Sequence, residues 1–392
     1  MKNFNIVIIG AGLYVCGKGT NAFGTILPSI FEWKRNNIQS GDVYCVSTSV
    51  KSSKELVQKA SDLETQTGVK INLKSYPKSG AKDKNAYKKL IKNLSKPACA
   101  IIAVPDHLHY KICKDVLSHK IHCLVVKPMV TKIDHAEKLF DLSKKNKLIG
   151  QVEFHKRLDE SNLIIRDKIQ NNAIGNLQYV NVNYSQRKII PTKQFKKWTN
   201  KSNIFQYLGV HYVDLINFIT GSKPISVNAW GLKDYLKKKK INTWDSIHAV
   251  IEWRNKNNKF LSIHSCNWID SNKSSAMSDQ KISFIGTKGR IESDQKNRGL
   301  QIVDDKNGVN DLNPYFSNKF LSSSNKYYFS GYGINSVNNF LKDVHELKNN
   351  QINLKVLEKV RPSFKSSLIS VYVTDAINKS LSSKNKKIKI NL

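Results

Sequence analysis

The segment Phe4-Asn5-Ile6-Val7-Ile8-Ile9-Gly10-Ala11-Gly12 carries the clearest indication of the fold. Residues 4–9 form a largely apolar run, which is typical of a strand buried on both faces of a parallel sheet. The two glycines that follow allow a tight turn in which backbone N–H groups can approach a phosphate. The third glycine usual in such turns is Val15 here. The motif alone therefore leaves a plain strand-to-helix turn open.

Strands and helices are predicted to alternate through the first 150 residues. Apolar runs predict strands at 43–46, 99–104, 122–126 and 148–154, and apolar residues every three to four positions predict helices at 53–63, 86–94, 107–117 and 133–143. This alternation indicates an α/β fold with a doubly wound parallel sheet, the Rossmann architecture.

From about residue 150 the pattern changes to strands joined by short turns, which indicates a large, mostly antiparallel open sheet. Strands are expected at 177–185, 225–231, 247–253, 260–268, 282–285, 290–293 and 388–390, and helices at 162–170, 204–220, 334–347 and 362–380. We expect three parts: a dinucleotide-binding domain at 1–128, a substrate-binding and oligomerisation α/β domain at 129–360, and a closing helix and strand at 361–392. There is no internal repeat, and we expect no disordered tail.

The length of 392 residues favours two domains, since a single hydrophobic core usually stops growing in shorter chains than this. No apolar run approaches the ~20 residues that cross a bilayer, so we expect a cytoplasmic protein that does not bind membranes. The six cysteines lack the spacing of a zinc site, and we expect them to be reduced, with no metal bound.

A formal net charge of +34 raises the possibility of nucleic-acid binding. The basic residues are 56 Lys and only 8 Arg, spread over every segment. Bidentate recognition of phosphate prefers Arg, and no element that reads a groove is evident. We therefore expect no specific nucleic-acid partner, although such a surface attracts anionic metabolites.

Two further motifs complete the pattern: Ile101-Ile102-Ala103-Val104-Pro105-Asp106-His107-Leu108-His109 and, on the next predicted strand, Val126-Lys127-Pro128. With the opening glycines, they resemble the glucose-fructose oxidoreductase, inositol dehydrogenase and MocA family. Similar blocks continue over nearly the whole chain, at 154–157, 207–214, 286–290 and the final helix.

The resemblance implies an enzyme: an NAD(P)-dependent dehydrogenase that transfers hydride at a CH–OH carbon of a sugar, cyclitol or sugar nucleotide. It also implies a homo-dimer or homo-tetramer, because the open sheet of this family often joins subunits. The family's lysine corresponds to Lys127, which would touch the substrate hydroxyl and the nicotinamide ribose, and its histidine to His211. Two positions depart from the family pattern. Val126 stands where the family usually has Glu before the lysine, and Tyr207 stands where it frequently has Asp four residues before the histidine.

Alcohol oxidation needs a base for the hydroxyl proton, and carbonyl reduction needs the same group as an acid. On a helix over 204–220, Tyr207, His211 and Asp214 would share one face. We expect Tyr207 and His211 to share the proton transfer while Lys127 orients and polarises the oxygen. Loss of the Glu beside Lys127 would let its pKa fall in a dry pocket. The alternatives are a structural histidine, a core tyrosine, and a structural or orienting role for Asp214.

The end of the second strand bears on the cofactor, since a carboxylate there would bind the ribose 2′-OH of NAD. The sequence has hydroxyls instead, so we expect NADP or NAD, with NADP slightly preferred. The expected cofactor-binding residues are Gly10, Ala11, Gly12, Leu13, Tyr14, Ser47, Thr48, Ser49, Val104, Pro105, His109 and Lys127. His109 is expected to cap or pack near the cofactor cleft.

The sequence also contains aromatic and polar residues that are candidates to line a sugar pocket. Aromatic rings stack on the apolar faces of sugars, and sugar hydroxyls need hydrogen-bond partners. The candidates are His155, Arg157, Gln186, Trp198, Trp244 and Trp268, for each of which core packing or an oligomer interface is the alternative. Two rival functions remain: a redox-neutral enzyme that cycles hydride internally, and a non-catalytic sensor of a dinucleotide or sugar.

Overall fold

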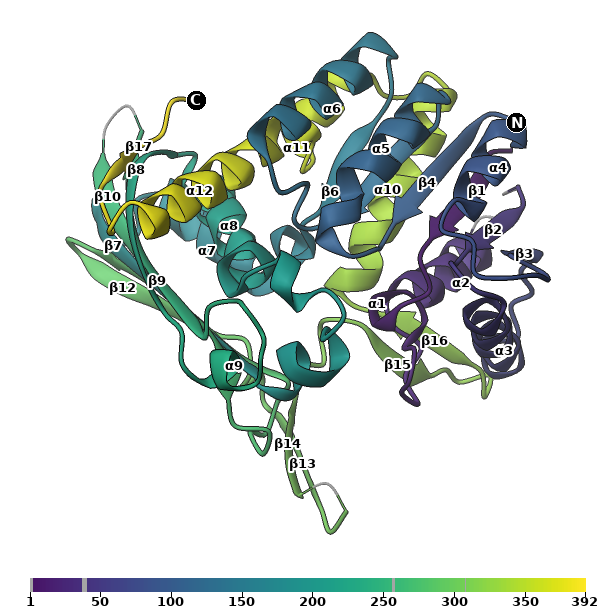
Figure 1. The fold of residues 1–392 in the computed structure, drawn as a ribbon, viewed down its shortest axis with the longest axis horizontal. Coiled ribbons are helices and arrows are strands. Elements are labelled where there is room, and N and C mark those ends of the chain that lie inside the picture. The colour runs from purple at the N-terminus through teal and green to yellow at the C-terminus, as the bar shows by residue number, and fades with distance from the viewer. Residues whose placement is uncertain (1–2, 37–40, 256–257, 307) are drawn as a thin grey trace. The chain divides into compact units, whose positions relative to one another are not determined.

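The computed structural model describes residues 3–36, 41–255, 258–306 and 308–392 (Figure 1). The chain divides into two compact units. The first comprises Met1–Val130, Asp134–Leu158 and Tyr315–Ser367, and the second comprises Thr131–Ile133, Asp159–Pro314 and Leu368–Leu392. The domains expected from the sequence are continuous, with boundaries after residues 128 and 360, whereas the two compact units are discontinuous, because residues 315–367 pack with the N-terminal segment.

The sheet of the first unit has six parallel strands in the order β3-β2-β1-β4-β5-β6. They are β1 (Asn5–Ile9), β2 (Val43–Val46), β3 (Leu73–Tyr76), β4 (Ala98–Ile102), β5 (His122–Val126) and β6 (Gly150–Glu153). This order confirms the predicted doubly wound sheet. The strand order reverses between β1 and β4, where the carboxyl ends of the strands form the usual ligand-binding edge of such a sheet.

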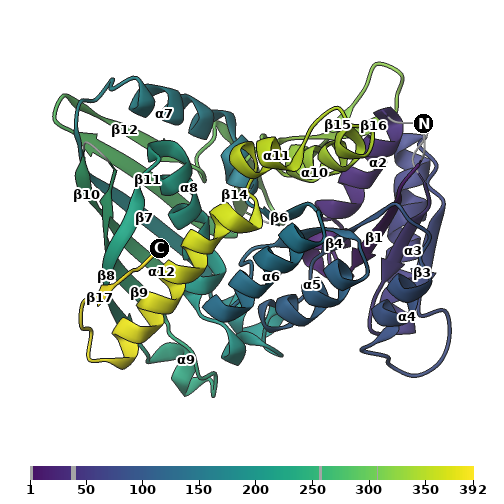
Figure 2. The same ribbon diagram turned by 90° about the horizontal axis from the view of Figure 1, so that it is seen from above.

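Helices flank this sheet (Figure 2). They are α1 (Leu13–Cys16), α2 (Ile26–Asn36), α3 (Val50–Thr67), α4 (Ala86–Asn93), α5 (His109–Ser118), α6 (Ile133–Lys145), α10 (Tyr332–Lys348) and α11 (Leu354–Val360). Three of the elements, α2, α11 and β3, were not expected from the sequence pattern. The α2 helix contacts α10, and both contribute to one hydrophobic core with β1 and β4.

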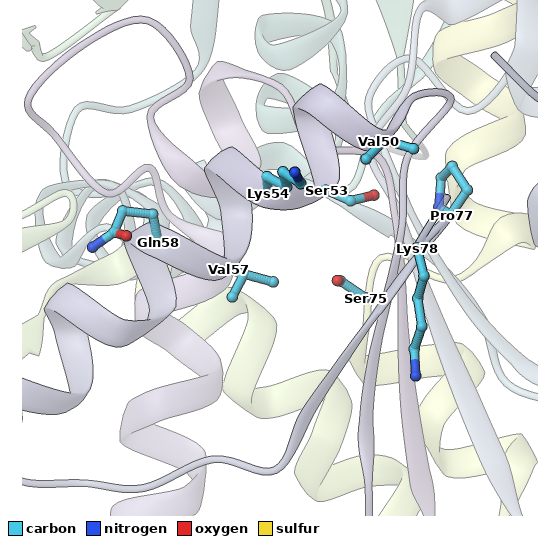
Figure 3. A pocket seen from close by; sticks show the side chains of 8 residues that line it. All are labelled: Val50, Ser53, Lys54, Val57, Gln58, Ser75, Pro77 and Lys78. Carbon is cyan, nitrogen blue, oxygen red and sulfur yellow. The ribbon is translucent and has the colours of Figure 1, made fainter. Parts of the chain in front are cut away.

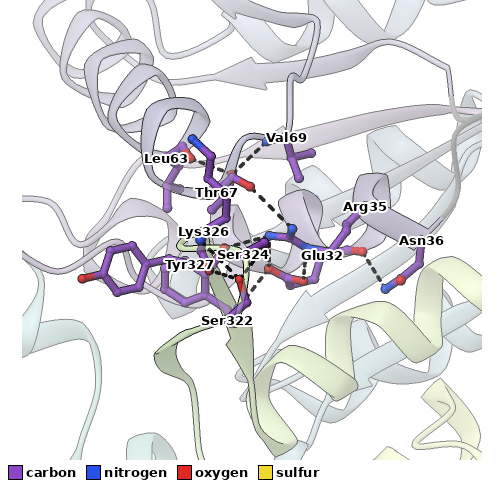
Figure 4. Close-up of polar contacts among 11 residues, drawn as sticks. Glu32, Arg35, Asn36, Leu63, Thr67, Val69, Ser322, Ser324, Lys326 and Tyr327 are labelled. Atoms are coloured by element: carbon purple, nitrogen blue, oxygen red, sulfur yellow. Dashed lines mark hydrogen bonds and ion pairs between the residues drawn. The ribbon is translucent and has the colours of Figure 1, made fainter.

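Residues 315–330 return to the first unit through a polar network (Figure 4). The carboxylate of Glu32 on α2 accepts hydrogen bonds from Arg35 and from the backbone N–H of Phe329 at 2.9 Å each. Arg35 donates to the carbonyl of Tyr327 at 2.9 Å and to that of Thr67 on α3 at 3.5 Å. The network therefore ties the unexpected hairpin β15 (Asn318–Leu321) and β16 (Tyr327–Ser330) to two helices.

The sheet of the second unit has seven strands in the order β12-β11-β7-β10-β9-β8-β17. They are β7 (Leu177–Arg187), β8 (Lys223–Leu232), β9 (Ser246–Arg254), β10 (Lys259–Asp270), β11 (Ser278–Gly286), β12 (Gly289–Asp294) and β17 (Ile388–Lys389). The pairing of β7 with β10 is parallel and the others are antiparallel. This confirms the expected mostly antiparallel sheet.

One face of that sheet carries the core, and the other is open. The helices α7 (Glu160–Gln170), α8 (Val210–Thr220) and α12 (Phe364–Ser382) lie along the core face (Figure 2). The opposite face exposes Tyr179, Trp230, Leu261 and Ile263, each 37–45% accessible. The homo-dimer or homo-tetramer expected from the resemblance stays a prediction.

The helix expected over residues 204–220 is not uniform. Phe205–Gly209 form a π-helical turn, and regular α8 begins only at Val210. Tyr207 lies in this π-helical turn and His211 in α8, and their sharing of one face stays a prediction. A further hairpin, β13 (Leu300–Asp304) with β14 (Gly308–Leu312), was also not expected.

The six cysteines all lie among the described residues and are buried thiols that form no disulfide. Within the described part of the chain, no helix is both long enough and apolar enough to span a bilayer. A search of the same residues finds no group of three or more His, Cys, Asp or Glu side chains that could hold a metal ion.

Candidate active site

The glycine turn follows β1 at the centre of the parallel sheet. Gly10 has φ +128°, and a Cβ there would lie 2.1 Å from the carbonyl oxygen of Ala103, so only glycine fits. Gly12 has an extended backbone, and a Cβ there would meet nothing within 4 Å. The space over Gly12 is therefore open to a ligand, which fits the close approach of a dinucleotide phosphate to backbone N–H groups.

The three hydroxyl residues after β2 have different roles. Ser47 is buried, and its hydroxyl donates to the carbonyl of Ser49 at 2.7 Å. Ser49 caps α3 by accepting from the N–H of Ser52 at 3.3 Å. Thr48 is exposed, so its side chain is the most accessible of the three. Lys18, which the sequence analysis missed, donates to the Ser52 hydroxyl at 2.5 Å and adds a cation nearby.

His109 supports the loops that follow β4 and β5. Its ring is fully buried, with Nδ1 2.7 Å from the carbonyl oxygen of Pro128 and Nε2 2.9 Å from that of Val104. These contacts hold the residue that follows Lys127 and the residue that precedes Pro105. This geometry fits the packing role expected of His109, because both ring nitrogens contact backbone carbonyl oxygens.

Lys127 follows directly after β5 and is half-buried. Burial of its ammonium lowers the Lys127 pKa from 10.5 to about 8, while the charges of Asp106 and Glu153 oppose this fall. The fall in pKa expected from the sequence is therefore confirmed in direction, although two carboxylates remain near the ammonium. A group with this pKa can exchange a proton close to neutral pH.

A second polar cluster lies at the end of β6. The Glu153 carboxylate oxygens are 3.0 and 3.2 Å from Nδ1 of His155, and the Tyr14 hydroxyl is 3.5 Å from the same nitrogen. The His155 ring stacks against Tyr14 and Tyr332, with centroids 6.4 and 5.7 Å apart, and also meets Phe316. Burial, and then the charge of Glu153, raise the Tyr14 pKa. Two predicted site residues, Tyr14 and His155, are thus brought together.

In the second unit, four predicted residues form one cluster. The Tyr207 ring lies 5.9 Å from that of Trp268 and 6.0 Å from that of Trp198, measured between centroids. The Trp268 indole donates to the Gln186 side chain at 2.9 Å. His211 is 3% exposed on α8. The cluster combines aromatic faces and an amide, which are the groups a sugar needs, although Trp268 itself is fully buried.

The remaining candidates lie elsewhere. Trp244 packs against Gly231 of β8, and the Lys233 ammonium lies 4.3 Å from its ring centroid. Arg157 is buried in the short 3-10 helix that follows β6. A hollow of about 380 Å³ lies beside α3 and β3 (Figure 3), and it contains neither the glycine turn nor Lys127. Its lining is Val50, Ser53, Lys54, Val57, Gln58, Ser75, Pro77 and Lys78.

Models of known protein families match both parts of the chain. Residues 4–154 match the model of the oxidoreductase family with an NAD-binding Rossmann fold, and residues 163–292 match the GFO/IDH/MocA C-terminal domain. Among curated relatives, glucose-6-phosphate 3-dehydrogenase from Bacillus subtilis is 24% identical over 33% of this chain and 40% of its own. The rhizopine catabolism protein MocA of Rhizobium meliloti is 25% identical over 32% and 38%.

The matched regions span 34% to 59% of the lengths of the curated relatives. Matches to solved structures cover nearly the full length of this chain. Scyllo-inositol dehydrogenase from Lactobacillus casei, with bound NAD(H) and scyllo-inositol, has a TM-score of 0.69 and 14% identity, and the match covers 99% of each chain. Myo-inositol 2-dehydrogenase from Lactobacillus plantarum has a TM-score of 0.67 and 15% identity, covering 100% of each. At these identities the likeness establishes the fold. With both domain models matched in order along one chain, the protein belongs to the GFO/IDH/MocA family of oxidoreductases.

Proposed function

We propose that this chain is an NAD(P)-dependent dehydrogenase acting on a CH–OH group of a sugar, cyclitol or sugar nucleotide. The observation that carries the proposal is Lys127, a lysine whose pKa lies near 8, at the carboxyl edge of a sheet that also carries the open glycine turn. The names of the relatives, which include inositol and glucose-6-phosphate dehydrogenases, support the substrate class.

The chemistry divides between cofactor and protein. A bound oxidised nicotinamide would accept the hydride from the carbinol carbon of an alcohol, and the hydroxyl proton would pass to a base of the protein as the carbonyl forms. We assign the orientation and polarisation of the substrate oxygen to Lys127, through its ammonium. His211 and Tyr207 take up the proton, and they return it when a carbonyl is reduced.

Substitution of Gly12 by Val tests the dinucleotide site. The extended backbone at Gly12 accepts a side chain, and the Cβ meets no protein atom within 4 Å, so Gly12→Val is expected to fold normally. The valine fills the space of the phosphate. Loss of charge-assisted hydrogen bonds to the phosphate, each about 1.5–3 kcal/mol, is expected to weaken NADPH and NADH binding by about 100-fold. Fluorescence titration of reduced nicotinamide measures both constants.

Gly289→Ala is the matched control, because a Cβ there meets only Ile174 Cγ2 at an ordinary 3.6 Å. We expect it to bind both dinucleotides as the unmodified chain does. Unchanged binding by a folded Gly12→Val variant would show that the glycine turn does not hold a dinucleotide.

Thr48→Asp tests the preference for NADP, which we propose over NAD. Thr48 is exposed after β2, with the cation of Lys18 bonded to Ser52 nearby. A carboxylate at position 48 accepts from a ribose 2′-OH but repels a 2′-phosphate. The ratio of NADP to NAD affinity is expected to fall by about tenfold or more, equal to about 1.4 kcal/mol. Thr65→Asp, on the exposed side of α3, controls for the added charge. An equal effect of both variants would refute the assignment of Thr48.

A further inference from the structure

Two segments of the second unit hold an unusual concentration of lysine. Residues 188–201 contain five lysines and no acidic residue, and residues 233–240 contain five lysines and one aspartate, Asp234. Lysine therefore makes up ten of these 22 residues, against about one in seven of the whole chain. The lysines of these two segments are termed the lysine patch.

The two segments lie against each other. The backbone N–H of Asn242, just after the second segment, donates to the side-chain oxygen of Asn200 at 2.9 Å. The ammonium of Lys188 lies 5.1 Å from the ring centroid of Tyr235, the first residue of the short helix α9 (Tyr235–Lys238). These contacts bring the two groups of lysines together in one region of the unit.

The positive charge of the lysine patch is largely unbalanced. Every lysine in it is exposed except Lys188, which is half-buried. Among the residues that the structure describes, Lys238 is the only member that forms an ion pair, with Asp234 at 2.8 Å. Clustered cations without carboxylate partners raise the local concentration of anions. The lysine patch is thus suited to attract an anionic ligand.

Aromatic rings adjoin the same lysines. The ring of Phe195 lies 4.5 Å from that of Trp198 and 5.0 Å from that of Tyr207, measured between centroids. All three rings are half-buried, and Lys196 and Lys197 stand between Phe195 and Trp198 in the sequence with exposed side chains. Rings of this kind stack on the apolar faces of sugars, while ammonium groups form charge-assisted hydrogen bonds to phosphate.

The backbone around these rings has an uncommon and well-anchored form. Two π-helical turns, Ile190–Gln194 and Phe205–Gly209, flank the rings in the sequence, and such turns occur frequently at functional sites. The fully buried hydroxyl of Thr199 lies 2.7 Å from the carbonyl oxygen of Phe195 and 3.0 Å from that of Pro191. The segment is therefore held by its own contacts, as a preorganised binding site requires.

We propose that the second unit binds a sugar carrying a phosphate group, with the sugar against the half-buried rings and the phosphate on Lys196 and Lys197. A phosphate ester carries between one and two negative charges near pH 7, so it gains from the other lysines of the patch as well. The inference rests on the proposed function only in treating this ligand as the substrate. It narrows the substrate class to phosphorylated sugars, which include sugar phosphates and sugar nucleotides.

The test is a titration of the full chain, without dinucleotide, followed by tryptophan fluorescence. The ligands are glucose, galactose and mannose, their 6-phosphates, and their nucleoside diphosphate derivatives. At least one phosphorylated sugar is expected to bind tenfold or more tightly than its neutral parent, and the difference should shrink as salt is added. The relative affinities of the 6-phosphates and the sugar nucleotides distinguish the two sources of phosphate.

Removal of two charges tests the assignment of the phosphate. Lys196→Gln with Lys197→Gln is expected to weaken binding of the phosphorylated sugar by about tenfold, and to leave binding of the neutral parent within about twofold. Lys144→Gln with Lys145→Gln is the matched control, because these lysines are also adjacent and exposed but belong to α6 of the first unit. The control pair should bind every ligand as the unmodified chain does.

Three results would overturn the proposal. They are equal affinities for phosphorylated and neutral sugars, equal effects of the two lysine pairs, and tighter binding of a short DNA strand than of every phosphorylated sugar, which would make the patch a nucleic-acid site. The titration needs no hydride transfer. A chain that binds phosphorylated sugars through these lysines but oxidises none would disprove the proposed function alone, whereas oxidation of neutral sugars only would disprove this inference alone.

Discussion

Lys127→Met is expected to lower kcat/KM by about 1,000-fold with any substrate that the chain oxidises. Methionine keeps the length of the side chain and removes the ammonium that polarises the reacting oxygen. Positioned proton-transfer and charge-stabilising groups contribute between about 100-fold and 10,000-fold to such reactions. In the unmodified chain, kcat/KM should also fall as pH rises above about 8, because Lys127 then loses its proton. Steady-state kinetics over a pH series measures both effects.

The stability of Lys127→Met separates lost catalysis from lost folding. The pKa of Lys127 is about 8 in the folded chain and 10.5 as an ordinary lysine, so between these values the unfolded chain binds more protons. The unfolding free energy of the unmodified chain therefore gains a contribution as pH rises from about 8 to about 10.5, and this contribution is absent in Lys127→Met. A stable variant that kept more than a tenth of the activity would contradict the role of Lys127.

His211→Gln is expected to reduce kcat by about 1,000-fold while dinucleotide binding stays within about twofold. The proposal gives His211 the proton of the substrate hydroxyl, and glutamine cannot accept or release a proton near neutral pH. His211 belongs to the second unit, whereas the glycine turn belongs to the first, so the cofactor affinity reports on a separate part of the chain.

His248→Gln is the matched control for this substitution. His248 is exposed on β9 and bonds to Ser265, and it lies in the same unit as His211. Its substitution should leave kcat unchanged. Equal losses in the two variants, or no loss in His211→Gln, would remove His211 from the reaction and leave Tyr207 as the proposed proton acceptor.

Much of the first unit could be predicted because its signals are local. Buried parallel strands read as continuous apolar runs, and the helices between them show regular apolar spacing. The α2 helix was missed because all its residues from Ile26 to Trp33 are buried, which removes the polar face that reveals a surface helix. The β3 strand was missed because its sequence, Leu-Lys-Ser-Tyr, lies half-buried at the sheet edge.

The glycine turn and Lys127 could be predicted because each lies in a short motif directly after an apolar strand. Glu153 could not be found in this way, because its hydrogen bonds to His155 and the position of Tyr14 beside that ring form only in the fold. Its only sequence signal is an acid at the end of an apolar strand. Tyr332 was beyond reach for a similar reason, since it joins the cluster only when residues 315–367 return to the first unit.

Transfer of a labelled hydride tests the proposed dehydrogenase activity itself. Inositols, aldoses and sugar nucleotides deuterated at the carbinol carbon are incubated with the protein and NADP or NAD, and the nicotinamide is analysed by mass spectrometry. We expect at least one substrate to yield reduced nicotinamide carrying one deuterium for each carbonyl formed. If no member of the panel gives labelled nicotinamide, whereas the protein binds the dinucleotide, the chain is not the dehydrogenase proposed above.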